Sequence, residues 1–334
     1  MLTYQRIIVL CLVLLVATTL VSLACGRYWI DIENIFYTLL APLNRSQQVT
    51  DTMLSIVWNV RLPRVLLAIV AGAGLAVAGT AFQALFANPL ATPDTLGVAT
   101  GSAFGAVLGI LLGIDGFGIQ ISSLFMGLMS VILVYGVSRI RGQNSVLMLI
   151  LSGLVIAALF SALISLVKYV ADPQDVLPSI TFWMMGSLTG ATMKTLALGL
   201  PFILTGSIVL YSLRWKLNAL SLPEDEARSL GIPLFRLRVL VIVCGTMITA
   251  SVVSMCGLIG WVGLLIPHFT RLLLGNNNTQ VLPTSLILGA LFVLSADTLA
   301  RSATEFEIPV SILTALIGAP VFIMLLRRNG GFQN

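Results

Sequence analysis

Side chains that could carry ionic or acid–base chemistry are rare in this sequence, and the densest group lies between Leu222 and Gly231. This stretch, LPEDEARSLG, holds three consecutive carboxylates, Glu224 to Glu226, and one arginine. Charged residues make up only 9% of the chain, and hydrophobic residues make up 58%. Such a group can form ionic contacts with another surface, or it can be an ordinary solvated loop.

The motifs of common catalytic and metal centres are absent from the sequence. It contains no GxxxxGK[ST] phosphate loop, no HExxH motif and no CxxC pair, and His268 is its single histidine. Because catalysis and metal binding need several titratable groups that converge, we expect no catalytic residue, metal or cofactor in this chain. The 18 basic residues exceed the 13 acidic ones, but in so apolar a chain they mark membrane flanks and do not indicate nucleic acid.

The elements that must position the charged groups are membrane helices. Mean hydropathy is +1.03, and the apolar stretches are about 20 residues long, the length of a helix that crosses a bilayer. We expect an all-α polytopic membrane protein, a single domain over residues 1–334, with about ten transmembrane helices. The spans are expected near residues 7–25, 65–84, 95–113, 119–138, 146–167, 195–213, 239–256, 260–274, 282–300 and 309–326.

An even number of crossings places both termini on one side of the membrane. When that side is the cytoplasm, most of the 18 basic residues fall in inner loops, as the positive-inside rule requires. Residues 26–64 then form an external loop, and residues 214–238 form a cytoplasmic loop that contains LPEDEARSLG. A second outer stretch, 168–194, is predicted to carry a short re-entrant or interfacial helix with Trp183.

Local signals predict a helix of about two turns inside LPEDEARSLG. Pro223 suits the first helical turn, and the acidic run complements the positive end of the helix dipole. Gly231 can adopt the left-handed conformation that ends a helix.

Glycines recur every fourth residue along the third expected span. This spacing places them on one helix face, where a neighbouring backbone can approach closely. We therefore predict a packing face formed by Gly97, Gly101, Gly105, Gly109 and Gly113.

Ionisable side chains are nearly absent from the expected spans. Asp297 is the clear exception, and its position four residues before Arg301 favours a local ion pair. Proton- and sodium-coupled carriers usually hold ionisable groups at membrane depth. The sequence therefore favours a pathway that is driven by a separate, energy-supplying protein.

Two stretches share a spacing that suggests an internal repeat. GTAFQALFANP (Gly79 to Pro89) and GLIGWVGLLIP (Gly257 to Pro267) each place proline ten residues after glycine, at the end of a span. Spans 2–5 and 7–10 would then be related halves of opposite orientation.

Several long motifs, in order from about residue 55 to the C-terminus, resemble the FecCD-type permeases of iron-siderophore, haem and cobalamin ABC importers. RLPR through NPLATPDTLG resembles the most recognisable block of the family, and GLIGWVGLLIPHFTR, SADTLAR and the EIPVSILTALIGAP ending resemble three others. Departures occur at Leu258, where many relatives have proline, and at Pro223 and Ser311, where glycine is common.

This resemblance implies a cobalamin-permease-like type II ABC importer fold with inverted-repeat halves in a bacterial inner membrane. It implies a second permease subunit and cytoplasmic ATPase subunits that hold ATP and magnesium. It implies coupling contacts to that ATPase at Leu222, Glu224, Glu226, Ala227, Leu230 and Gly231. It also implies that Arg61, Arg64 and Arg301 engage acidic residues of an extracytoplasmic solute-binding protein, since guanidinium–carboxylate pairs fix orientation.

The preferred cargo is a ferric siderophore, because it is the commonest in the family. Haem, cobalamin and an oxyanion such as molybdate stay open. Two other classes of protein are alternatives for this sequence: a gradient-driven secondary transporter, and a membrane enzyme or structural subunit.

Overall fold

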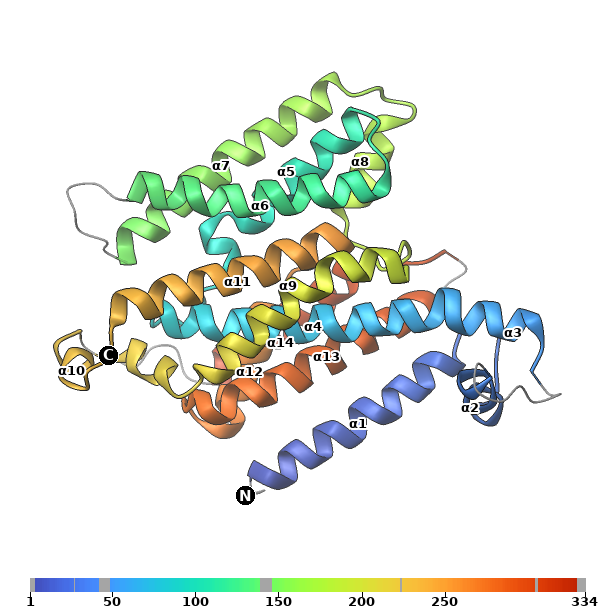
Figure 1. Cartoon of the computed structure of the whole chain (residues 1–334), viewed down its shortest axis with the longest axis horizontal. Coiled ribbons are helices and arrows are strands. Elements are labelled where there is room, and N and C mark those ends of the chain that lie inside the picture. The colour runs from blue at the N-terminus through green and yellow to red at the C-terminus, as the bar shows by residue number, and fades with distance from the viewer. Residues whose placement is uncertain are drawn as a thin grey trace.

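The computed structural model describes residues 4–26, 28–41, 49–138, 146–222, 224–303 and 306–328. Every regular element within these ranges is helical (Figure 1). The elements are α1 (Tyr4–Ala24), α2 (Ile32–Leu40), α3 (Asp51–Ser55), the π-helical η1 (Ile56–Arg61), α4 (Leu62–Leu85), the 3₁₀ helix η2 (Pro93–Leu96), α5 (Val98–Leu111), α6 (Gly116–Ser138), α7 (Val146–Val170), α8 (Val176–Met184), α9 (Met193–Ser212), the 3₁₀ helix η3 (Lys216–Ser221), α10 (Glu224–Ser229), α11 (Leu234–Cys256), α12 (Val262–Leu274), α13 (Asn278–Ser302) and α14 (Val310–Arg328).

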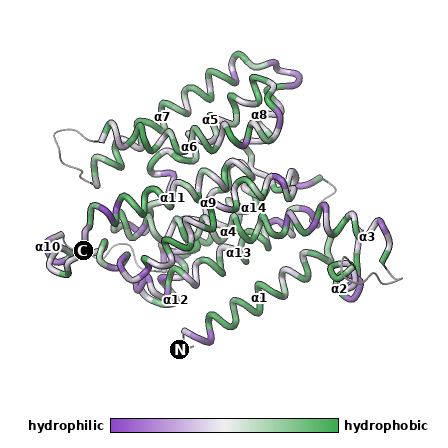
Figure 2. The backbone as a smooth tube through the Cα atoms, viewed as in Figure 1, coloured by the Kyte–Doolittle hydropathy of each residue, from purple (hydrophilic) through white to green (hydrophobic). Residues whose placement is uncertain are grey.

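The expected spans correspond to ten apolar helices within the described ranges. Seven of them are long and apolar enough to cross a membrane, and α5, α12 and α14 are shorter apolar helices. Figure 2 shows hydrophobic residues along these helices and more hydrophilic ones toward the ends of the bundle. The short helix predicted around Trp183 is α8.

The stretch 26–64, predicted to be an external loop, is largely helical where it is described. Helices α3 and η1 continue without a break into α4, so residues 51–85 form one 35-residue helix. Pro63 is at the start of α4, where proline usually begins a helix, but the π turn continues the helix upstream of it. The Trp58 indole nitrogen donates to the Thr38 carbonyl at 3.0 Å and ties η1 to α2.

The helices form two runs with the same sequence of lengths. In both α4–α7 and α11–α14, a long helix precedes a short one, and two longer helices follow. The residue just before each short helix, Gly97 or Trp261, has a positive φ, 67° and 70° respectively. Helix α4 begins beside α3, whereas α11 begins beside α10 at the other end of the bundle (Figure 1). The two runs are therefore inverted relative to each other.

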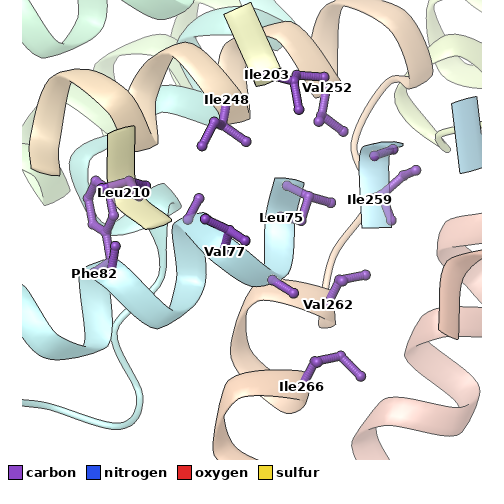
Figure 3. Close-up of a cluster of buried hydrophobic side chains, with 14 of the residues drawn as sticks. Leu75, Val77, Phe82, Ile203, Leu210, Ile248, Val252, Ile259, Val262 and Ile266 are labelled. Atoms are coloured by element: carbon purple, nitrogen blue, oxygen red, sulfur yellow. The ribbon is translucent and has the colours of Figure 1, made fainter. Parts of the chain in front are cut away.

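Helix α4 lies at the centre of the packing and contacts α13, α11, α12 and α9. Figure 3 shows the interior cluster that these helices share, with Leu75, Val77 and Phe82 from α4 opposite Ile248 and Val252 from α11. Glycines allow the closest approaches. A Cβ atom at Gly72 would lie 2.2 Å from the Gly289 carbonyl oxygen on α13, and one at Gly79 would lie 2.0 Å from the Gly263 carbonyl oxygen on α12.

Candidate functional site

The charged stretch forms the short helix α10, as its sequence predicts. The helix spans Glu224–Ser229, and Gly231 follows it with a φ of 71°. No atom lies within 4 Å of a Cβ placed at Gly231, so glycine is required there by the backbone conformation and not by crowding. Pro223 lies outside the described residues.

One side of α10 is anchored and the other is open to solvent. Ala227 is completely buried, and α10 packs against η3 and α11. Glu226 is exposed, as are the apolar side chains of Leu222 and Leu230, at 40% and 61%. An exposed leucine on each side of an anchored helix that carries carboxylates suits contact with another protein.

Arg64 lies inside the protein, in an ion-pair cluster at the end opposite α10. Its guanidinium binds the Asp297 carboxylate on α13, with Nε–Oδ1 and Nη2–Oδ1 distances of 2.9 Å. Its Nη1 also contacts Glu307 at 2.8 Å. Asp297 is fully buried and Arg64 is 6% exposed. The pair therefore joins α4 to α13, at a sequence separation of 233 residues.

Arg61 and Arg301 hold the end of α1 in the same region. Arg61 donates to the carbonyl oxygens of Leu23, Ala24 and Tyr28. Arg301 donates to the Cys25 carbonyl at 2.8 Å and to Ser22. Most of these bonds satisfy carbonyl groups at the C-terminal end of α1, which have no partner inside that helix, and the bond to Tyr28 holds the chain just after it.

This arrangement bears directly on two sequence predictions. The predicted Asp297–Arg301 pair exists at 3.7 Å, but the distance from Asp297 to Arg64 is shorter, at 2.9 Å. Docking of a solute-binding protein by Arg61, Arg64 and Arg301 stays a prediction. In this structure it would require three buried guanidinium groups to leave their present partners.

The glycine face on α5 is shorter than its spacing suggests. A Cβ at Gly101, Gly105 or Gly109 would meet α6, at 2.7 Å from the Ser130 Cβ, 2.3 Å from the Ser122 oxygen and 3.3 Å from Ile119 respectively. The outer two glycines instead lie at helix ends with positive φ. Gly97 approaches Ala157 on α7, and Gly113 has nothing within 4 Å.

Asp94 is a solvent-accessible acid that the sequence analysis overlooked. It lies in η2, between α4 and α5, beside a cavity of about 320 Å³ that Leu75, Thr249 and Trp261 also line. The N-cap of α5 is Gly97, and Asp94 lies three residues before it, so no helix-capping pattern pointed to Asp94 in the sequence.

The described ranges hold ten apolar helices, eight of them in two inverted runs, and a short, partly exposed helix between the runs. Together these features define a polytopic membrane permease of the ABC importer class. The chain belongs to the FecCD transport family, whose model matches residues 14–328.

Similarity to individual proteins extends over nearly the whole chain. The molybdate import permease MolB of Haemophilus influenzae is 44% identical over 98% of both chains. A probable iron chelatin permease of Helicobacter pylori is 40% identical over 83% of both. A solved ABC transporter structure, described as an inward-facing conformation of the metal-chelate type, is 41% identical. It covers 97% of this chain and 99% of its own, with a TM-score of 0.88.

Proposed function

We propose that this chain forms the membrane pathway of a binding-protein-dependent importer and that α10 transmits motion from a separate ATPase subunit. The observation that supports this role most directly is α10 itself. Its Ala227 is buried against the permease, while Leu222, Glu226 and Leu230 face outward. A rigid, partly apolar helix can transmit movement from one protein to another while the contact between them stays intact.

The proposed orientation places α10 and both chain termini in the cytoplasm of a bacterial cell, with this chain in the inner membrane. The end that carries α2, α3 and the Arg64–Asp297 pair then faces outward. There we propose that a solute-binding protein docks, with Arg61, Arg64 and Arg301 holding the ends of α1, α4 and α13 in a fixed arrangement. A second permease subunit would complete the pathway, and ATP binding and hydrolysis would drive alternating access.

Leu230→Asp tests the ATPase contact. We expect it to weaken ATPase binding by roughly 30-fold, about the 2 kcal/mol typical of a hot-spot residue, because Leu230 is 61% exposed on the proposed contact. Co-purification and titration with the cognate ATPase would measure this. Phe306→Asp is the matched control, since Phe306 is 85% exposed at the opposite end. Equal ATPase binding by the Leu230→Asp variant and the wild-type chain would contradict the assignment.

For the cargo, we propose a metal oxyanion of the molybdate class. The support is the full-length, 44% identical relative named for molybdate import. A ferric chelate, the cargo favoured in the sequence analysis, is the second candidate, because a 40% identical relative is named for iron chelatin transport. Glutamine, serine and threonine side chains are the main polar groups inside the described helices, and neutral groups bind an anion weakly enough to release it.

Reconstitution distinguishes these cargoes. The chain would be placed in liposomes with its cognate ATPase and binding protein, and uptake of molybdate, ferric siderophore, haem and cobalamin compared. We expect ATP-dependent uptake of molybdate to exceed that of the other three. Preferred uptake of ferric siderophore would select the second candidate, and uptake without ATP would overturn the importer mechanism.

A further inference from the structure

A polar pocket at the α10 end of the bundle is not part of any site described above. It has a volume of about 540 Å³ and lies where the C-terminal end of α4, η3 and the turn between α12 and α13 meet. Its polar lining residues are Gln83, Asn88, Asn218, Ser221, Arg271, Asn276 and Asn277. The described lining contains one cation, Arg271, and no carboxylate.

Among the residues that the structure describes, Arg271 is held loosely and only by neutral groups. Its Nε to Gln83 Oε1, Nη1 to Asn276 O and Nη2 to Thr80 O distances are all 3.4 Å, and only the bond to Asn278 Oδ1 is shorter, at 3.1 Å. Ordinary N–H···O bonds are about 2.9 Å long, and those to a carboxylate are shorter still. Arg64 shows the contrast, since it meets Asp297 at 2.9 Å.

The C-terminal end of α12 neutralises only part of the positive charge of Arg271. Arg271 lies in the last turn of this helix, where the helix dipole provides about half an elementary charge. A half-buried guanidinium beside this pocket keeps a net positive potential, which a small anion would neutralise.

The surrounding amides are arranged to donate. The Asn88 side-chain oxygen accepts from the Leu90 N–H at 2.9 Å. The Asn277 oxygen accepts from Asn218 and Thr279. In the part of the chain that the structure describes, the Nδ2 groups of Asn88 and Asn277 form no intramolecular hydrogen bond, so they are available to a ligand.

We propose that this pocket binds a phosphate-type tetrahedral oxyanion, with the Arg271 fork as its charged partner and asparagine amides as its further donors. Guanidinium groups match such oxyanions in geometry as well as in charge. The anion is either a free oxyanion or the headgroup of an anionic phospholipid. This proposal does not depend on which cargo the importer carries.

The free-oxyanion arm uses the purified full-length chain in an uncharged detergent, titrated with inorganic phosphate or molybdate at constant ionic strength. We expect dose-dependent thermal stabilisation, weakened about tenfold or more in the Arg271→Gln variant because a charge-assisted bond is lost. Asn276→Asp is the second variant, since it adds a carboxylate to the lining while Arg271 keeps its place. Arg214→Gln is the matched control, because Arg214 lies outside the pocket over the Tyr211 ring at 4.2 Å.

The lipid arm measures phosphatidylglycerol retained after delipidation, by native mass spectrometry. Retention by the wild-type and Arg214→Gln chains, but not by the two pocket variants, would identify the headgroup form. Stabilisation by free phosphate or molybdate with the same pattern would identify the free form. The proposal is overturned if neither ligand binds, or if Arg271→Gln and Asn276→Asp bind as the wild type does.

Discussion

The Asp297→Asn substitution is expected to lower the free energy of unfolding by about 3–5 kcal/mol, the cost of removing one partner from a buried ion pair. Asp297 is fully buried, and its carboxylate accepts from both Nε and Nη2 of the Arg64 guanidinium, each at 2.9 Å. Without it, the buried guanidinium of Arg64 keeps only Glu307, while Arg61 and Arg301 add further positive charge nearby. A chemical unfolding titration in detergent micelles would measure the loss.

Two further variants test whether the loss of stability comes from the burial of the Arg64–Asp297 pair. Glu307→Gln removes the other carboxylate, but Glu307 is 33% exposed, so we expect a cost of about 1 kcal/mol or less. Arg64→Met combined with Asp297→Leu removes both buried charges, and this double variant should be more stable than Asp297→Asn alone. Equal losses for Asp297→Asn and Glu307→Gln would contradict the buried pair.

The second large effect is expected at the crossing of α4 and α12. Gly79→Ala would place a Cβ atom 2.0 Å from the Gly263 carbonyl oxygen, and two backbones cannot separate without disturbing the rest of the core. We expect a loss of about 3 kcal/mol or more, at or above the upper end for overpacked interiors. The yield of folded protein and its unfolding midpoint in detergent would report this loss.

The same crossing provides graded controls. A Cβ atom at Gly263 would lie 3.1 Å from the nearest atom, the Leu75 oxygen, so Gly263→Ala should cost less than Gly79→Ala. Gly136 on α6 has nothing within 4 Å, and Gly136→Ala should be neutral or stabilise by about 0.5–1 kcal/mol. A reversed order of these three variants would show that helix approach does not determine the effect.

Local features were predicted well from the sequence because their signals lie within a few residues. The acidic run and the glycine of LPEDEARSLG predicted α10 and its left-handed end at Gly231. Apolar length predicted the ten helices, including the short α12. The inverted runs exist, but the shared Gly-to-Pro spacing does not mark equivalent positions in them. Gly79 lies inside α4 and Pro89 follows that helix, whereas Gly257 follows α11 and Pro267 lies inside α12.

Long-range features were missed because spacing along one helix carries no information about other helices. The Asp297–Arg301 spacing predicted a local pair, but Arg64 from α4 is the nearer partner. For the same reason, five evenly spaced glycines predicted one continuous face. The backbone turns at Gly97 and Gly113 end α5 before the face can extend to them.

The glycine crossings also limit which parts of the molecule can move. At Gly72–Gly289 and Gly79–Gly263, main chains touch directly, with no flexible side chains between them to change rotamer. Sliding α4 past α12 or α13 would bring main-chain atoms into collision. We infer that these three helices move little relative to one another, and that the motions of the proposed transport cycle come from the helices packed around them.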